Sequence, residues 1–457
     1  MPLPSHRPRP CSRRLRLQTL AIALGLGAAA GAHAQSLQEL YLAAHDYDAT
    51  YLGARASLDA AQYRYDQARG LRLPQVGLGL SAARSLSSTP DASTQTANTT
   101  STGATVNGSQ TVFNRANDVT ITQSQKAVDL SRADLDAAEQ DLILRVSQAY
   151  FDVLAAQDNL ATAKASLAAI SEQVASAKRN FEVGTATITD TREAQARYDL
   201  ARFTQIQADN DLTTKRILLD QTVGRVGVVP RQLAVPVAMP ALAPADVSDW
   251  VARGDTEHPA VRKARLALEI ARLDTDKARA GHLPTVTLNG SYGRGHATTQ
   301  GAVAPGTSFG YSTPSTSSSI ALTVNVPLFA GFQVQNRIKE TLVLEDKSQN
   351  DLEASRRGVA QATRTLFYAV GSGTAQVSAL EAAESSSKLA LEATQLGFKV
   401  GVRVNIDVLN AQAQLYSTQA QLAKARYDLI VAGLRLRQAS GRLTPDDVGS
   451  VNALLVR

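Results

Sequence analysis

The chain has 457 residues, of which 44% are hydrophobic but only 5% aromatic, a composition that favours long, closely packed helices over a thick globular core. Its formal net charge is +6, but residues 1–34 hold five arginines and no acid, so removing them leaves +1 and no basic excess for nucleic acid. The single cysteine, Cys11, also lies in this segment, which excludes disulfides and thiol chemistry from the rest of the chain.

Residues 1–34 have the pattern of a secretory signal peptide. A positively charged region precedes an apolar run at 20–30, and Ala32-His33-Ala34 fits the small-x-small motif, which predicts cleavage after Ala34. Ser12-Arg13-Arg14 is a weak match to a twin-arginine signal, and an ordinary positive region is the favoured interpretation. No apolar run of about 18 residues follows, so a membrane crossing would have to use strands.

The next elements alternate between helical and strand periodicity. Apolar residues at three- and four-residue steps predict a helix over 36–70, which Leu73-Pro74 ends. A strand is expected over 76–83, a solvated Ser/Thr-rich loop over 85–103, and a second strand over 104–113. A helix of about 100 Å is then expected over 114–181. A shorter helix over 188–223 follows, on which the helix over 36–70 is expected to stack end to end.

A second set of elements follows the same order. A helix over 257–280 ends at Leu283-Pro284, and strands are expected over 286–293 and 319–328 with a Ser/Thr/Gly loop between them. No proline occurs between Leu328 and Pro445, which predicts long helices again. The last helix has large apolar residues seven apart, as coiled coils do, at Val408, Leu415, Leu422, Leu429 and Leu436.

The turns between the long helices indicate a duplication. Gly184 follows Phe181-Glu182-Val183, Gly401 follows Phe398-Lys399-Val400, and the same offset of 217 carries Gly224-Arg225 to Gly441-Arg442. Gly184 and Gly401 are expected at a left-handed position just past a helix C-terminus. Asn405 is expected to cap the helix that follows the second turn.

This duplication sets the predicted domain organisation. Structural repeats are expected at 35–225 and 247–442, joined by a Pro-rich linker at 226–246. The tail at 443–457 is expected to form a short helix at Pro445 with Thr444 as its N-cap.

Four strands per chain are too few to close a membrane barrel, because the smallest have about eight and an open edge leaves backbone groups unpaired in lipid. The chain must therefore oligomerise, and two, three or four copies would give eight, twelve or sixteen strands. The predicted fold class is mainly α with a small β part, a short barrel continued by a long coiled-coil tube. Its far end is the set of turns, where a gate is expected at Thr189, Asp190, Phe398, Arg403, Asp407 and Asn410.

The order of these motifs resembles the TolC family of outer-membrane channel-tunnel proteins, which serve type I secretion and multidrug efflux in Gram-negative bacteria. The resemblance covers essentially all of the chain after residue 34. Its markers are Leu73-Pro74-Gln75-Val76-Gly77-Leu78, Gly281-His282-Leu283-Pro284-Thr285, Phe181-x-Val183-Gly184 with Ile188-Thr189-Asp190, and Val400-Gly401-x-Arg403 with Ile406-Asp407-Val408-Leu409.

The resemblance implies a homotrimer with a twelve-stranded barrel in outer-membrane lipid and a helical tunnel through the periplasm. Such a trimer would dock to a periplasmic membrane-fusion adaptor and to an inner-membrane ABC or RND transporter, and would act as a passive conduit.

The resemblance also assigns roles at the turns. In the family, an arginine after the second turn ties its helix pair to the Thr-Asp pair after the first, so Arg403 is expected to pair with Thr189 and Asp190. Phe398 stands where the compared family member has a tyrosine, and it lacks the hydroxyl to hydrogen-bond. Asn410 replaces a second aspartate, which leaves Asp407 as the only carboxylate ring of the pore constriction and implies a weaker cation preference.

Several alternatives remain open at this point. Asp407 also suits a helix N-terminus through the macrodipole, and Arg403 also suits a solvated turn. A periplasmic coiled-coil adaptor or scaffold would keep the heptads but lack paired amphipathic strands, and a diffusion porin would have many more strands and no long helices. The sequence does not indicate the cargo.

No enzyme, cofactor or metal is expected. The histidines of the chain after the leader are scattered, with no second ligand at metal spacing, and no nucleophile motif or paired catalytic acids stand out. These four histidines are His45, His258, His282 and His296.

Overall fold

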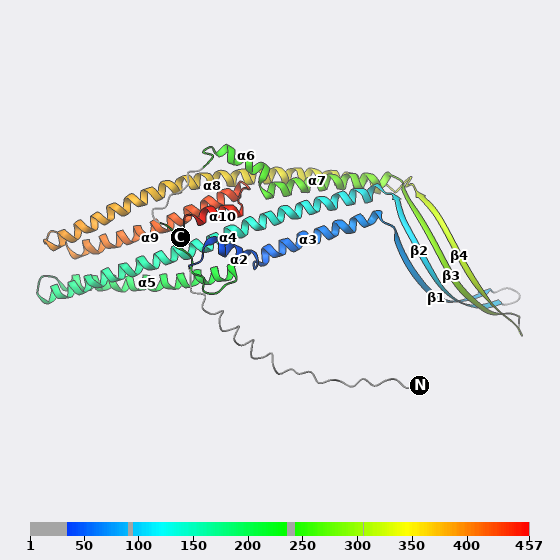
Figure 1. Cartoon of the computed structure of the whole chain (residues 1–457), viewed down its shortest axis with the longest axis horizontal. Coiled ribbons are helices and arrows are strands. Elements are labelled where there is room, and N and C mark those ends of the chain that lie inside the picture. The colour runs from blue at the N-terminus through cyan, green and yellow to red at the C-terminus, as the bar shows by residue number, and fades with distance from the viewer. Residues whose placement is uncertain (1–33, 90–94, 235–242, 305, 457) are drawn as a thin grey trace, which may run out of the picture.

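The computed structural model describes residues 34–89, 95–234, 243–304 and 306–456 (Figure 1). The predicted signal peptide lies outside the described residues, apart from Ala34. The described chain is elongated, with a β-sheet at one end and helices over the rest of its length. The predicted class, mainly α with a small β part, is confirmed.

Two long helices run from the sheet to the far end of the molecule (Figure 1). These are α4 (Arg115–Glu182) and α8 (Gln333–Lys399), of 68 and 67 residues and therefore about 100 Å each. Helices α3 (Ala49–Arg69) and α5 (Ile188–Val223) lie one after the other along α4. Helices α7 (Pro259–Arg279) and α9 (Asn405–Ala439) do the same along α8. The predicted order of two shorter helices along the long one is thus confirmed, but the part of residues 36–70 that lies against α5 is the short helix α2 (Leu37–His45).

Three short helices gather near the middle of the molecule: α2 (Leu37–His45), α6 (Val247–Glu257) and α10 (Pro445–Asn452). The predicted tail helix is α10, and Thr444 forms a capping box with Asp447 at its start. Helix α6 was not predicted. It ends at His258 because Pro259 opens α7, where a proline fits the first helical position.

The prediction of a single helix over 36–70 is wrong, because residues 46–48 are not helical and separate α2 from α3. Asp48 lies at the break, and its carboxylate accepts a hydrogen bond of 2.8 Å from the Tyr51 backbone N–H. Arg145 of α4 donates to the same carboxylate at 2.8 and 3.1 Å. The Arg145 hydrogen bond is the main cause that lowers the pKa of Asp48 below its usual value. The contact between Arg145 of α4 and the capping residue Asp48 is a tertiary interaction, so the helical periodicity of residues 36–70 does not predict it.

The sheet is antiparallel with the order β1-β2-β3-β4. Its strands are β1 (Gln75–Thr89), β2 (Gln95–Phe113), β3 (Thr285–Ala304) and β4 (Thr307–Asn325). Short 3-10 turns at Gly70–Arg72 and Ala280–His282 lead into β1 and β3.

The loops expected at 85–103 and between 293 and 319 are wrong for most of their length, because the four strands occupy all of the described residues there except Gly306. Thr89 pairs with Gln95, and Ala304 pairs with Thr307. Ser and Thr are polar, but the ladder satisfies their backbone groups and threonine is a good strand former. Alternation of apolar and polar residues therefore underestimates a strand whose two faces are both polar.

The two faces of the sheet differ in the half that adjoins the helices. Leu78 pairs with Val106, which pairs with Tyr292, so these three side chains share one face. That face also carries exposed apolar side chains at Val76, Leu80, Leu288, Ile320, Leu322 and Val324. The opposite face bears small or polar residues at Gly77, Gly79, Thr105, Asn289, Ser291 and Ser319. Strands β1 and β4 form the two edges of this sheet.

The main core lies in the middle of the molecule, where α4 packs against α2, α5, α9 and α10. Its largest fully buried side chains are Leu37, Leu40, Leu142, Ile143, Val146, Tyr150, Phe151, Val153, Leu154 and Leu219. The Tyr150 hydroxyl donates to the backbone carbonyls of Arg231 at 2.9 Å and Gln35 at 3.3 Å. Tyr150 thereby fastens the linker and the start of the described chain to α4. Within the described residues, no helix combines the length and apolarity that a membrane span requires.

Tyr150→Phe should lower the free energy of unfolding by about 1–2 kcal/mol, because the carbonyls of Arg231 and Gln35 lose the hydroxyl that they share while the ring stays in place. The measurement is the urea midpoint of the detergent-solubilised protein. Tyr368→Phe is the matched control, since Tyr368 is 65% exposed and should leave the midpoint unchanged. Equal midpoints for Tyr150→Phe and wild type would contradict this role.

Candidate functional site

The two interhelical turns lie side by side at the end of the molecule opposite the sheet (Figure 1). Gly184 and Gly401 both adopt a φ of 81°, the left-handed conformation that disfavours other residues. The N–H groups of Thr185 and Val402 bond back to the carbonyls of Asn180 and Gly397, at 2.8 and 2.9 Å. Both turns therefore use the same hydrogen-bonded exit from a long helix.

The helices after the turns start differently. Thr187 caps α5, and the Asp190 carboxylate accepts from the Thr187 N–H at 2.9 Å and hydroxyl at 2.7 Å. At α9 the N-cap is Val404, which has no side-chain cap. The predicted cap role of Asn405 is wrong, because Asn405 is the first helical residue and is only 5% exposed. Its Oδ1 accepts a hydrogen bond from the Gln173 side chain of α4.

Arg403 lies exposed just before α9. Its Nη1 is 3.6 Å from Oδ2 of Asp407 one helical turn later, so Arg403 forms an ion pair with Asp407 within one chain. Side-chain exposures of 61% and 35% make the pair weak, because water screens it. In the single chain, Arg403 thus pairs with Asp407 while Asp190 bonds to Thr187. Thr189 is also exposed, on the first turn of α5.

The remaining predicted site residues are Phe398 and Asn410. Phe398 is half-buried in the last turn of α8. Asn410 is exposed on α9, and its Oδ1 accepts a 3.1 Å hydrogen bond from Nη2 of Arg197 on α5. Arg197 and Gln173 were not among the predicted residues. Each bridges two helices more than 200 positions apart in the chain, so no local pattern signals them.

A small apolar cluster joins the two helical hairpins close to the turns. It consists of Ile170, Val174 and Ala177 on α4, Ala194 on α5 and Leu409 on α9, with Tyr198, Ala201 and Ile406 packed against it. Ala194 and Leu409 are 0% and 1% exposed. Beyond the cluster, the turns expose Val183, Val400, Val402 and Val404, each by more than half. The far end is thus held by one compact cluster and two interhelical hydrogen bonds, with an apolar outer tip.

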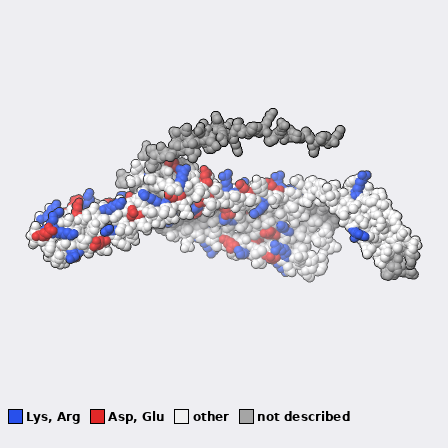
Figure 2. All heavy atoms as spheres, turned by 90° about the horizontal axis from the view of Figure 1, so that it is seen from below, with Lys and Arg blue, Asp and Glu red and all other residues white. Residues whose placement is uncertain are grey.

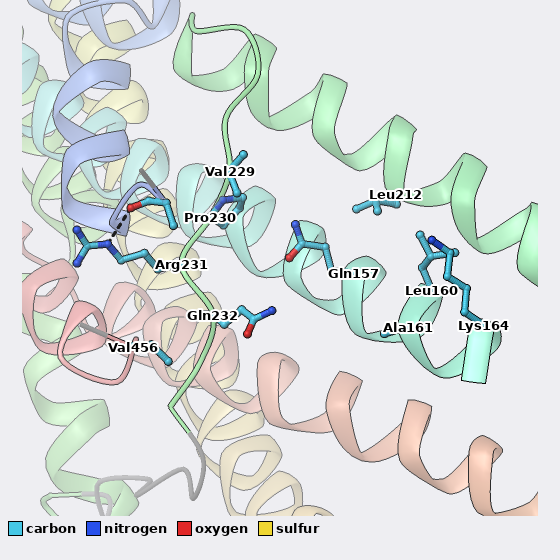
Figure 3. A pocket seen from close by; sticks show the side chains of 11 residues that line it. Gln157, Leu160, Ala161, Lys164, Leu212, Val229, Pro230, Arg231, Gln232 and Val456 are labelled. Carbon is cyan, nitrogen blue, oxygen red and sulfur yellow. Dashed lines mark hydrogen bonds between the residues drawn. The ribbon is translucent and has the colours of Figure 1, made fainter. Parts of the chain in front are cut away.

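A cavity of about 820 Å³ lies elsewhere, between α4, α5 and the linker segment 229–232 (Figure 3). Gln157, Leu160 and Lys164 of α4 face Leu212 of α5 across it, and Val456 lies at its lower end. Arg231 donates from Nε to the carbonyl of Ala34 at 2.9 Å. The lining residues combine apolar, amide and cationic groups and include no carboxylate, so they offer no carboxylate base to pair with Lys164. Nowhere in the described part of the chain do three His, Cys, Asp or Glu side chains gather as metal ligands would.

Leu409→Ala should leave a cavity in the apolar cluster and destabilise the contact between the hairpins by about 2–5 kcal/mol. Amide hydrogen exchange of residues 170–201 should then be faster than in wild type. Leu396→Ala, at a leucine 63% exposed near the same end, is the matched control and should leave the exchange unchanged. Identical exchange in the two variants would show that the cluster does not hold the hairpins together.

Sequence comparison identifies related proteins over most of the chain. The family model described as outer membrane efflux protein matches residues 49–225 and 255–442. Outer membrane protein TolC of Vibrio cholerae is 32% identical over 423 residues, which cover 92% of this chain and 94% of TolC. Alkaline protease secretion protein AprF of Pseudomonas aeruginosa is 31% identical over 323 residues, covering 69% of this chain and 65% of AprF.

The fold is also similar to a solved structure of the outer-membrane channel OprN. The two superpose with a TM-score of 0.76 at 18% identity, over 89% of each chain. The family model matches both halves of this chain, and TolC of Vibrio cholerae aligns over nearly its whole length. The chain therefore belongs to the outer membrane efflux protein family, which includes TolC, and is located in the outer membrane of a Gram-negative bacterium.

Proposed function

We propose that three copies of this chain form a passive exit duct for a type I secretion or multidrug efflux system. The observation that carries the proposal is the four-stranded sheet. Its edge strands β1 and β4 each have one side without a partner strand in a single chain, and the half that adjoins the helices is apolar on one face. Backbone groups at an open edge are costly in lipid, so each edge requires a partner strand. Pairing β4 of one copy with β1 of the next satisfies both edges at once.

The number of copies follows from the resemblance to the TolC family together with barrel geometry. Three copies supply twelve strands, which exceeds the minimum of about eight for a membrane barrel. The apolar face then meets lipid, and the face with Gly77, Gly79 and Ser291 lines a wet lumen. Helices α4 and α8 continue this cylinder into the periplasm for about 100 Å.

We place the gate at the interhelical turns. Arg403 is exposed and only weakly paired with Asp407, so it is available to a carboxylate that assembly brings near it. We propose that the closed trimer brings Arg403 to Thr189 and Asp190, a solvated link that contributes about 1 kcal/mol per copy. A link of that strength holds a duct shut and is broken by docking of a partner.

The pore constriction is proposed at Asp407 and Asn410. Asp407 supplies one carboxylate per copy, and Arg403 beside it offsets part of that charge. The Asn410 side chain is neutral and is engaged by Arg197. A ring with this composition should favour cations less than one with two carboxylates per copy.

Partners and cargo are proposed from the site and the relatives together. The exposed valines of both turns, Val183, Val400, Val402 and Val404, suit docking of a periplasmic membrane-fusion adaptor, which links the duct to an inner-membrane ABC or RND transporter. The name of AprF ties that protein to alkaline protease secretion, which supports a protein cargo as one option beside small molecules. The paired amphipathic strands count against the alternative of a periplasmic adaptor or scaffold.

Disulfide cross-linking tests the shared cylinder, because the only natural cysteine, Cys11, lies in the predicted leader. Gly79→Cys on β1 is combined in turn with Ala321→Cys, Thr323→Cys and Asn325→Cys on β4, which lie on the same face of the sheet as Gly79. At least one pair should give linked species of two and three chains on a non-reducing gel. Gly79→Cys alone is the control. Absence of linkage in all three pairs, or species of more than three chains, would contradict the trimer.

Conductance in planar bilayers tests the gate. Arg403→Ala and Asp190→Asn should both raise single-channel conductance, because each removes one charge of the proposed link. Asparagine is chosen at position 190 because it keeps a side-chain oxygen for the hydrogen bonds to Thr187. Arg192→Ala, at an exposed arginine on the same turn of α5, is the control and should leave conductance unchanged. Unchanged conductance in both gate variants would remove the assignment of Arg403 and Asp190.

A further inference from the structure

The outward face of the sheet changes character along the strands. Near the helices it is apolar, at Val76, Leu78, Leu80, Val106, Leu288, Tyr292, Ile320, Leu322 and Val324. Farther along, the same face is mostly polar, with Asn98, Thr298, Gln300 and Ser312, although it also exposes Leu86 opposite Asn98. The strands are thus longer than their apolar section, which we call the apolar band.

Two arginines mark the end of the apolar band. Arg84 of β1 and Arg294 of β3 are the only Lys or Arg residues within the four strand ranges, which contain no Asp or Glu. In Figure 2 the sheet end of the molecule accordingly shows blue but no red, whereas both colours are mixed over the helices. Both arginines are exposed on the outward face. Arg84 Nε donates to Asn98 Oδ1 of β2 at 2.9 Å, which anchors its guanidinium to the sheet.

The two arginines occupy equivalent positions in the duplicated chain. Arg84 lies ten residues after Pro74, and Arg294 lies ten residues after Pro284, and each proline follows an equivalent 3-10 turn. Ten strand residues rise about 33 Å along the strand, or about 25 Å along the axis of a barrel with strands tilted near 40°. The apolar section of outer-membrane barrels is also about 25 Å tall. Both guanidinium groups are therefore level with the headgroups of the leaflet farther from the helices.

We propose that Arg84 and Arg294 form a binding site for the phosphate groups of a phosphorylated glycolipid in the outer leaflet. Arginine binds phosphate through two parallel, charge-assisted hydrogen bonds, and no carboxylate of the strands competes for either guanidinium. One strand separates β1 from β3, and the pairing through Ala104 of β2 places Arg294 level with Leu80, four residues before Arg84. The two arginines are therefore about 10 Å apart across the strands and about 13 Å apart along them, and each takes a separate phosphate group. The inference rests on the proposed function in one respect, namely that the sheet spans the membrane with the helices in the periplasm.

The test uses the full-length protein purified in detergent and titrated with diphosphorylated lipid A or with the same lipid after dephosphorylation. Bound lipid is counted by native mass spectrometry. Wild type should bind the phosphorylated lipid more tightly, and Arg84→Gln/Arg294→Gln should weaken that binding about tenfold or more. Arg84→Lys/Arg294→Lys, which keeps the charge without the bidentate geometry, should fall between the two.

The matched control removes two exposed arginines from the helices, as Arg64→Gln/Arg357→Gln, and should bind like wild type. Equal affinity for both lipids, or unchanged affinity in Arg84→Gln/Arg294→Gln, means that the arginines are only solvated boundary residues and overturns the proposal. Displacement of the lipid by equimolar inorganic phosphate also overturns it, since the site would then recognise the free ion. If the double variant does not assemble, Arg84→Gln and Arg294→Gln are measured singly against the same criteria.

Failure of the proposed function gives a different result. Wild-type protein that binds phosphorylated lipid A but forms no channel in planar bilayers contradicts the duct and leaves the lipid site intact. Channels of normal conductance formed by wild-type protein with no preference for the phosphorylated lipid contradict only the lipid site.

Discussion

Backbone hydrogen bonding at the edges of the sheet is the constraint on which the rest of this structure depends. Strands β1 and β4 each present a row of backbone groups that one chain does not pair. The sheet also has an apolar face, on which the Ile320 side chain is 85% exposed. In water such an edge invites aggregation, and in lipid it is costlier still because no solvent replaces the missing partner. An assembly that joins these edges removes both costs, and it also brings the long helices together as a tube.

The helical part divides its stability unevenly along its length. The middle holds a dense core around Tyr150 and Phe151, to which the linker, the tail and α2 all contribute. The far end relies on the cluster around Leu409, the hydrogen bonds of Asn405 and Asn410, and one solvated ion pair. Weak interactions at the end of long, otherwise stable helices let the turns move without unfolding the core, which is the property that a gate requires.

The charged side chains are distributed differently over the helices and the strands. Salt bridges such as Lys126–Glu269 and Lys263–Asp134 connect α4 to α7 along the helical part, where water accompanies them. The strands have almost no charged side chains, and the two arginines that they do carry stand at the end of the apolar band. A cation is least costly at that level, because the charged head meets water and headgroups rather than hydrocarbon. The same duplication that repeats the helical turns repeats these arginines.

The sequence by itself determined whatever depends on local chemistry. Heptad spacing and the absence of proline marked the long helices, Gly184 and Gly401 marked the turns, and the offset of 217 marked the duplication. Only the tertiary structure decided the extent of the Ser/Thr-rich strands, the break at Asp48, the burial of Asn405 and the partners of Asn410 and Arg403. Most of these depend on groups brought together from distant parts of the chain, as Gln173 is brought to Asn405, and periodicity within one segment carries no information about them.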